Sequence, residues 1–288
     1  MGERIVVAVK GDGPSCAALN WAAERADRGQ GQLVLVNVVD DTPADAASDL
    51  ETRAARRALE ALDDERERIR RQFPHLTVTT SLAHGSVLHA LRLLSEDCDL
   101  LVIGTHKHGM FSGALLGSLS IRIAAAAVCS VAVIPELVPA ATSVVVGVDD
   151  TPESQIAADF AAREASAMGD DLIMVCAGYV ANPLLTDLVP PVLPGRERAQ
   201  ILARISERVL QLIPTLSVRT RVMDGPAQRA LLDVARTARL LVVGHRRQSK
   251  LSQLFEGSVS WDVLLGMSTP VVVARDSVIV DTDSSAQS

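Results

Sequence analysis

Two glycine-rich segments of the sequence have residue types suited to binding a phosphate group. Residues 104–120 and 244–260 stand 140 positions apart, and both end in Gly-Ser-x-Ser. Glycine lets a backbone approach an anion closely, and a helix beginning after each segment would present free N–H groups and the positive end of its dipole. Four serine hydroxyls could donate hydrogen bonds to the same anion, those of Ser118, Ser120, Ser258 and Ser260. We therefore predict a phosphate site at the end of each segment.

A second set of candidates follows the first strand expected in each half of the chain. The second half has Gly147-Val-Asp149-Asp there, and the first half has Ala8-Val-Lys10-Gly. In an open parallel sheet, ligands bind beyond the carboxyl ends of the strands, where the strand order reverses, so the two sets should meet. The predicted binding residues are Gly147, Asp149, Gly244, His245, Arg246, Arg247, Gly257, Ser258, Val259 and Ser260 and, with weaker binding, Gly104, Lys107, Gly117, Ser118 and Ser120.

The repeat extends upstream and indicates two copies of one domain. Five residues recur at the same offset of 140: Pro74, Leu76, Val78, Thr80 and Gly85 return as Pro214, Leu216, Val218, Thr220 and Gly225. β-branched runs predict strands at 5–9, 33–39, 76–83, 100–104 and 131–134, then at 144–148, 172–176, 216–223, 240–244 and 271–274. The helical patterns between them predict right-handed crossovers, hence α/β domains with mainly parallel sheets covered on both faces. We expect domains at 1–138 and 143–276 and a disordered tail at 277–288.

Composition narrows the classes of function. The chain of 288 residues is 48% apolar but only 2% aromatic, so its core is aliphatic and it offers few rings for single-stranded nucleic acid to stack on. A net charge of −7 also disfavours binding to duplex nucleic acid. No uninterrupted apolar stretch is long enough for a membrane span. Four scattered cysteines without a CxxC pair are typical of buried thiols in a reducing compartment, so we expect a cytoplasmic protein without a metal site.

With these motifs in place, the sequence resembles the universal stress proteins, in the tandem form common in actinobacteria. Nucleotide-binding members of that family carry Gly-x2-Gly-x9-Gly-Ser/Thr after the fourth strand and an Asp at the end of the first. The resemblance implies two doubly wound domains, each a five-stranded parallel sheet of order 3-2-1-4-5 with helices on both faces. It also implies binding of ATP or a related adenine nucleotide, with Mg²⁺ as an optional companion, in stress adaptation and without an established reaction.

The sequence departs from that pattern at the middle glycine, which is Lys107 in one copy and Arg247 in the other. The first copy also has Lys10 where the family places Asp, and Ala8 where the second copy keeps Gly147. Lys107 and Arg247 could block a lost site, or they could reach the phosphates as cations. Because the second copy keeps Asp149, we favour retained binding there and weak or absent binding in the first copy.

We consider three functions: a nucleotide-binding module, a nucleotide-free interaction protein, and an ATPase or adenylyl-transferring enzyme. The leading hypothesis is a stress-response sensor or regulator that binds an adenine nucleotide mainly in its second domain, without strong catalytic activity. The alternative is a nucleotide-free member of the family that acts through protein–protein contacts. We do not expect an enzyme, because no general base or Mg²⁺-binding carboxylate cluster is visible beyond Asp149 and Asp150. The resemblance also implies that residues 131–134 and 271–274 pair the two domains within the chain, and further surfaces could form a homodimer.

Overall fold

The computed structural model describes residues 2–10, 13–39, 47–105, 118–138, 140–178, 193–245 and 259–276. In the first half the elements are β1 (Arg4–Ala8), α1 (Gly13–Arg28), β2 (Gln32–Val39), α2 (Ala47–Gln72), β3 (Thr77–His84), α3 (Val87–Leu94), β4 (Leu100–Gly104), α4 (Ser118–Ala126) and β5 (Ser130–Ile134). In the second half they are β6 (Ser143–Gly147), α5 (Pro152–Met168), β7 (Asp171–Gly178), α6 (Gly195–Leu212), β8 (Val218–Asp224), α7 (Ala227–Ala235), β9 (Leu240–Gly244), α8 (Val259–Gly266) and β10 (Val271–Ala274). The predicted tail at 277–288 lies outside the described residues.

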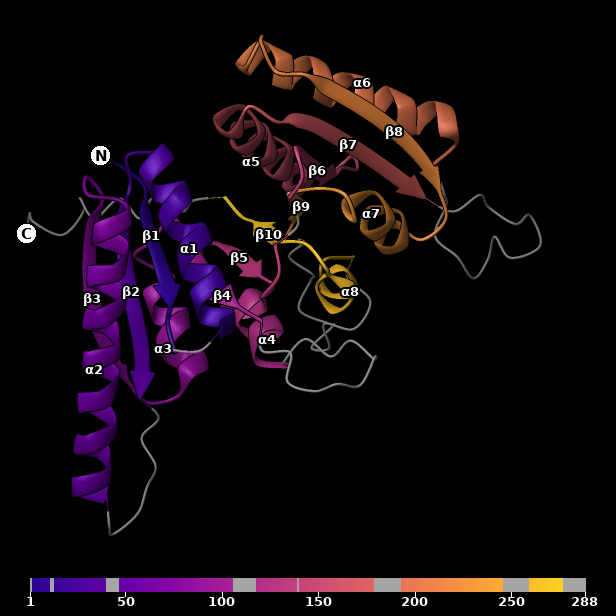
Figure 1. The fold of residues 1–288 in the computed structure, drawn as a ribbon. Coiled ribbons are helices and arrows are strands. Elements are labelled where there is room, and N and C mark those ends of the chain that lie inside the picture. Colours follow the sequence, from indigo (N-terminus) through magenta and orange to yellow (C-terminus); the bar gives the residue numbers. More distant parts are fainter. Residues whose placement is uncertain are drawn as a thin grey trace, which may run out of the picture.

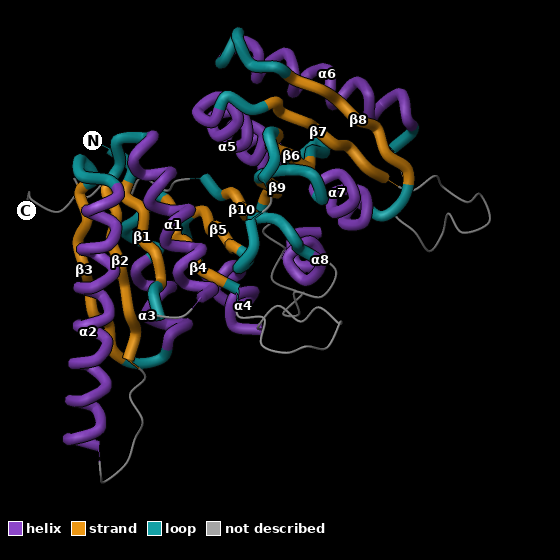
Figure 2. Tube along the Cα trace, in the orientation of Figure 1, coloured by secondary structure: helices purple, strands orange, loops and turns teal. Residues whose placement is uncertain are grey.

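The described strands form one ten-stranded sheet that runs through both halves (Figure 1). Its order is β3-β2-β1-β4-β5-β10-β9-β6-β7-β8, so each half has the predicted order 3-2-1-4-5. Every pair within a half is parallel, as the helical crossovers require. Figure 2 shows the helices placed on both sides of the strands. The predicted α/β class and tandem doubly wound architecture are confirmed.

The two domains join through an antiparallel pair, β5 with β10. Ala132 lies opposite Val272, and these two residues occupy the same position in the two copies. On either side of them Val131 pairs with Val273, and Val133 with Val271. The pseudo-twofold axis therefore passes between Ala132 and Val272. The predicted pairing of the last strands within one chain is confirmed.

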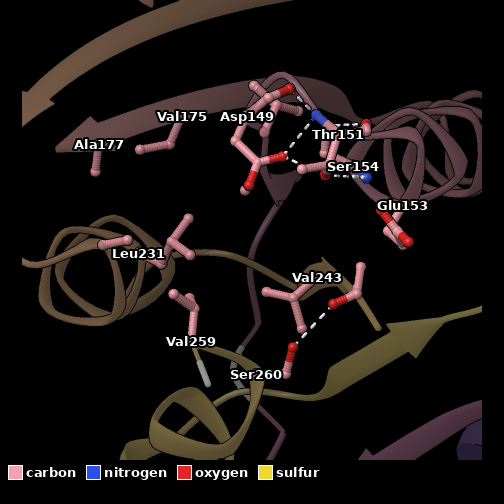
Figure 3. Close-up of a pocket in the computed structure, with 14 residues that line it drawn as sticks. Asp149, Thr151, Glu153, Ser154, Val175, Ala177, Leu231, Val243, Val259 and Ser260 are labelled. Carbon is pink, nitrogen blue, oxygen red and sulfur yellow. Dashed lines mark hydrogen bonds between the residues drawn. The ribbon is translucent and has the colours of Figure 1, made fainter. Parts of the chain in front are cut away.

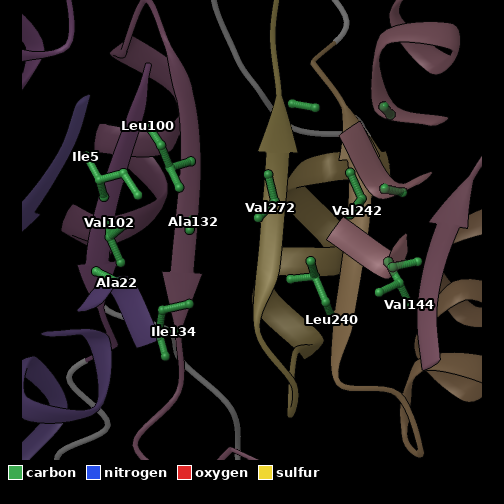
Figure 4. Packing of buried hydrophobic residues seen from close by; sticks show 14 of the residues in the cluster. Ile5, Ala22, Leu100, Val102, Ala132, Ile134, Val144, Leu240, Val242 and Val272 are labelled. Carbon is green, nitrogen blue, oxygen red and sulfur yellow. The ribbon is translucent and has the colours of Figure 1, made fainter. Parts of the chain in front are cut away.

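The hydrophobic core forms two layers, one on each face of the sheet, and both cross the junction between domains. One layer contains residues of α1, α2, α5 and α6, and the other contains residues of α3, α4, α7 and α8. In α1 the buried residues Ala18, Ala22 and Ala26 recur at helical spacing, and small side chains let that helix lie close to the strands. Figure 4 shows buried aliphatic side chains on both sides of the junction, including Ile134 and Val272.

The repeated glycines after the third strand of each copy have a backbone explanation. Gly85 and Gly225 have φ of 96° and 106°, a region that residues with a Cβ rarely adopt.

The repeated leucines just before these strands lie in turns, because Leu76 N–H donates to Phe73 O and Leu216 N–H to Ile213 O, both at 3.1 Å. The strands consequently begin at Thr77 and Val218, one and two residues after the predicted starts.

Candidate ligand site in the second domain

A cavity of about 180 Å³ lies at the carboxyl ends of β6 and β9. These two strands are parallel neighbours at the point where the strand order of the domain reverses, which is where an open α/β sheet binds ligands. Fourteen residues line it (Figure 3), namely Gly147, Val148, Asp149, Thr151, Glu153, Ser154, Val175, Ala177, Ala227, Leu231, Val243, Gly244, Val259 and Ser260. Five of the predicted residues are therefore brought together, since Gly147, Asp149, Gly244, Val259 and Ser260 belong to this list.

Asp149 is held by the turn that leads from β6 into α5. Its Oδ1 accepts a hydrogen bond from Thr151 N–H at 3.1 Å and a second from the Thr151 hydroxyl. Thr151 in turn caps α5, because its Oγ1 accepts from Ser154 N–H at 3.3 Å, and Ser154 Oγ donates to Asp149 O at 2.7 Å. In Figure 3 the other carboxylate oxygen of Asp149 points toward the cavity. This oxygen is well placed to accept a hydrogen bond from a ligand.

Apolar side chains form the rest of the wall. Val175 and Ala177 project from β7 toward the cavity, and Leu231 of α7 faces them (Figure 3). Gly147 lies directly behind Leu231, because a Cβ built at this glycine would come within 2.8 Å of Leu231 Cδ1. Because Gly147 has no side chain, Leu231 can keep its position against the strand. The position of Leu231 in turn determines how wide the cavity is.

Gly244 is needed for the close approach of two backbones. A Cβ at this position would lie 2.5 Å from Glu153 O and 2.8 Å from its carbonyl carbon. The first turn of α5 therefore packs directly on the end of β9, and this packing brings Thr151 and Ser154 to the cavity. Gly244 thus shapes the site by allowing the start of α5 to pack on the end of β9.

In each Gly-Ser-x-Ser motif, the last serine forms a hydrogen bond within the protein. Ser260 Oγ donates to Gly244 O at 2.8 Å, and Ser120 Oγ donates to Gly104 O at 3.3 Å. Each hydroxyl ties the start of a helix to the end of the fourth strand of its domain. The predicted donation from Ser120 and Ser260 to a phosphate would require these hydroxyls to turn away from the two carbonyls, and it stays a prediction.

His245 was also predicted to bind the ligand, but it is not among the residues that line the cavity. Its Nδ1 lies 3.2 Å from Arg275 Nη2. The same guanidinium donates to Cys129 O at 3.2 Å and to Ala124 O, both in the first domain. His245 thus adjoins the domain junction.

Several predicted residues lie outside the described part of the chain. These are Lys107, Gly117, Arg246, Arg247, Gly257 and Ser258. Gly104 ends β4, Ser118 begins α4 and Val259 begins α8. In the first domain, Lys10 is exposed at the position that corresponds to Asp149.

Among the described residues that line the cavity, the charged ones are Asp149 and Glu153, and both are acidic. Carboxylates accept hydrogen bonds from hydroxyl groups and repel phosphate, so this part of the site suits a sugar or a base better than a phosphate chain. Within the described ranges, no cluster of three or more His, Cys, Asp and Glu side chains has the arrangement of a metal site. The same residues include no helix long and apolar enough to cross a membrane.

Sequence reasoning missed most of the wall. Thr151 and Ser154 could have been found, because Asp-Asp-Thr-Pro-Glu-Ser after a strand is a helix N-cap signal. Leu231, Val175 and Ala177 gave no such signal, because they reach the cavity only through the packing of α7 and β7 around β6.

Comparison with known proteins gives one consistent result. The model of the "Universal stress protein family" matches residues 1–135 and 141–275. The universal stress protein Rv2005c of Mycobacterium tuberculosis is 30% identical over 304 aligned positions, covering 95% of this chain and 97% of that protein. Rv1996 of the same organism is 36% identical over 208 positions, and the alignment spans 69% of this chain and only 65% of that relative. A universal stress protein structure from Archaeoglobus fulgidus superposes with a TM-score of 0.77 at 17% identity, covering 94% of this chain and 98% of that one.

Proposed function

The chain belongs to the universal stress protein family, and on that premise we propose that its second domain binds ATP or a related adenine nucleotide. In this proposal the protein acts in the cytoplasm as a sensor or regulator in a stress response, and it releases the nucleotide unchanged. The observation that carries the proposal is the cavity between β6 and β9, with one carboxylate oxygen of Asp149 facing it.

The lining residues fit the nucleoside part of such a ligand. Val175, Leu231 and Val243 offer an apolar surface for a base, and Asp149 offers an acceptor for a ribose hydroxyl. A volume of about 180 Å³ is below the ~300–1,000 Å³ of most ligand pockets, so the cavity would hold part of the nucleotide. The phosphates would then extend toward the start of α8. Arg246 and Arg247, which follow β9 in the sequence, are the candidate cations for them. Mg²⁺ could offset the charge of Asp149 and Glu153.

A second candidate function is a nucleotide-free protein that acts through protein–protein contacts. The observation in its favour is the acidic lining of the cavity together with Lys107 and Arg247 at the two middle-glycine positions. In that case the domain would keep the family fold, and its surface would carry the function.

Analysis of the ligand content distinguishes these two functions. Protein purified from the expression host without added nucleotide is denatured, and the released small molecules are identified by mass spectrometry. Equilibrium dialysis of the stripped protein with ATP, ADP, AMP and cyclic AMP follows, each with and without Mg²⁺. The proposal expects one adenine nucleotide per chain. No nucleotide in the extract, and no binding at millimolar concentration, would favour the second function.

A further inference from the structure

Two cysteines that are 31 residues apart in sequence meet at the amino ends of β4 and β5. The Sγ atoms of Cys98 and Cys129 lie 3.5 Å apart. Cys98 lies between α3 and β4, and Cys129 lies between α4 and β5. Nearby, Val128 N–H donates to Ser95 Oγ at 2.9 Å, which fastens the two connections to each other. The sequence predicts buried thiols without a CxxC pair, and the structure brings two of these free thiols into contact.

The backbone around this pair suits a disulfide. Leu100 and Ser130 are partners in the parallel ladder of β4 and β5, and the cysteines lie just before them. Neighbouring strands are about 4.8 Å apart, and a disulfide joins Cα atoms about 4.4–6.8 Å apart. Cys98 lies two residues before Leu100 and Cys129 one residue before Ser130, so the two cysteines are one residue out of register. Their Sγ atoms are 3.5 Å apart and must approach by a further ~1.5 Å to form the bond.

The surroundings of Cys129 favour its thiolate. The hydrogen bond between the two sulfur atoms, the Leu101 N–H and the positive charge of Arg275 lower the pKa of Cys129, against the opposing effect of its burial. The bond to Cys129 and burial raise the pKa of Cys98. Burial raises the pKa of Cys176 to about 11, which leaves it about 100-fold less thiolate at pH 7 than a thiol of pKa 9. Of the two thiols in contact, that of Cys129 is therefore the better nucleophile.

The second domain shows that the fold does not need these thiols. The corresponding positions hold Ala238 and Thr269, where Thr269 Oγ1 donates to Ala238 O at 2.7 Å. A hydrogen bond between the two connections thus replaces the pair of sulfur atoms. This difference supplies a conservative variant for the first domain, in which Cys98→Ala and Cys129→Thr reproduce the residues of the second.

We propose that Cys98 and Cys129 are a modification site at which a hydroperoxide forms a reversible disulfide within the first domain. The Cys129 thiolate attacks one oxygen of hydrogen peroxide, the O–O bond breaks, and hydroxide leaves and takes up a proton as water. Cys98 then attacks the sulfur of the resulting sulfenic acid, so that the S–S bond forms and the S–O bond breaks. The leaving hydroxyl departs as a second water with the Cys98 proton. Two thiols are oxidised by two electrons, and one peroxide is reduced to two waters.

The disulfide would form beside the domain junction. Arg275 of the second domain donates to Cys129 O at 3.2 Å, and its backbone N–H donates to Ser130 Oγ at 3.0 Å. Oxidation would therefore restrict the segment at Cys129 and Ser130 to which Arg275 is hydrogen-bonded.

The experiment treats the reduced full-length protein with graded hydrogen peroxide, blocks the remaining thiols with N-ethylmaleimide and maps the peptides by mass spectrometry. We expect loss of two thiols per chain, a linked Cys98–Cys129 peptide, and alkylated Cys16 and Cys176. A thiol reductant should restore all four thiols. In Cys98→Ala, the sulfenic acid at Cys129 should persist and react with dimedone, because no second thiol resolves it.

Two variants control for these results. Cys16→Ser with Cys176→Ser should form the disulfide as the natural protein does. Cys98→Ala with Cys129→Thr should lose no thiol at the same peroxide dose and keep the natural circular dichroism spectrum. Earlier oxidation of Cys16 or Cys176, a link between two chains, or four intact thiols at doses that oxidise a free cysteine would each overturn the proposal.

Discussion

Arg25 in α1 and Glu164 in α5 form an ion pair across the domain junction, with 2.7 Å between Arg25 Nη2 and a carboxylate oxygen of Glu164. The two side chains are only 10% and 7% exposed. They also occupy the same position in the two copies, because Trp21 corresponds to Phe160 four residues earlier in each helix. Two first domains would place two arginines there, and two second domains would place two glutamates. This site therefore favours pairing of unlike domains.

The first prediction concerns the stability of this junction. Arg25→Ala leaves the buried carboxylate of Glu164 without its cation, and we expect a loss of about 3–5 kcal/mol in the free energy of unfolding. Glu164→Ala should cost less, because Arg25 keeps its ion pair with Glu3. The double variant should lose less than the sum of the two, because one pair is removed only once. Urea denaturation of the four proteins gives the coupling energy, and strictly additive losses would show that the pair is not coupled.

The second prediction concerns the copy that binds nucleotide. Asp149→Asn keeps an Oδ1 acceptor for Thr151 but removes the charge that faces the cavity, so nucleotide affinity should fall by about tenfold or more. Lys10→Ala changes the corresponding position of the first domain and should leave affinity unchanged. Isothermal titration calorimetry on both variants is the test. Equal losses would move the site out of the second domain.

The third prediction concerns the width of the cavity. In Gly147→Ala the new methyl group would meet Leu231 Cδ1 at 2.8 Å, so that side chain must shift. The first domain already holds Ala8 and the buried Leu91 at these positions, so the fold should tolerate the change at a cost below about 1.5 kcal/mol. Nucleotide affinity should fall while the melting temperature stays close to that of the natural protein. A large loss of stability with unchanged affinity per folded molecule would contradict the assignment of Leu231 to the wall.

The fourth prediction concerns backbone packing at the site. Gly244→Ala places a Cβ 2.5 Å from Glu153 O, and a backbone atom cannot move aside as a flexible side chain can. We expect a loss of about 1–3 kcal/mol and weaker nucleotide binding, because the start of α5 must shift. Gly29→Ala is the matched control, since its Cβ would meet only Arg25 O at an ordinary 3.5 Å. Thermal unfolding should give a clearly lower melting temperature for Gly244→Ala than for Gly29→Ala. Equal melting temperatures of the two variants would refute the close-packing argument.

The fifth prediction concerns turnover. Phosphoryl transfer needs a placed metal ion and an oriented nucleophile, and the titratable side chains on the described part of the cavity wall are two carboxylates. We therefore expect no steady release of phosphate from ATP by the purified protein. A malachite-green assay over several purification steps checks this. A constant specific rate that disappears in Asp149→Ala would make the protein an ATPase.

The sequence repeat was enough to predict the architecture, since the strands alternate with helices in the same order twice. The resemblance to the universal stress proteins, and not the repeat, implied which strands join the domains, and two such edges in one chain can pair with each other. Element ends were less accurate near Leu76 and Leu216, where a buried leucine in a turn continues the alternating pattern of the following strand.

The sequence predicted that glycines and serines of two segments come together, and it did not predict the contacts that these residues make within the protein. Glycine and serine near a helix start have two uses, one toward a ligand and one toward the protein, and the sequence pattern is the same for both. For Gly244 and Ser260 the structure shows the second use. The Cys98–Cys129 pair was missed for a different reason, since their contact depends on the alignment of β4 with β5, and no spacing rule along the chain reports it.

The antiparallel pairing of β5 with β10 has a consequence for how this molecule can change over time. In a symmetric pair of identical chains, any substitution near the axis appears on both sides at once and must be compatible with its own copy. Here Ala132 and Val272 face each other as separate positions of one chain, so each can be altered alone. One half can thereby lose a ligand or gain a reactive thiol pair while the other half remains as it was.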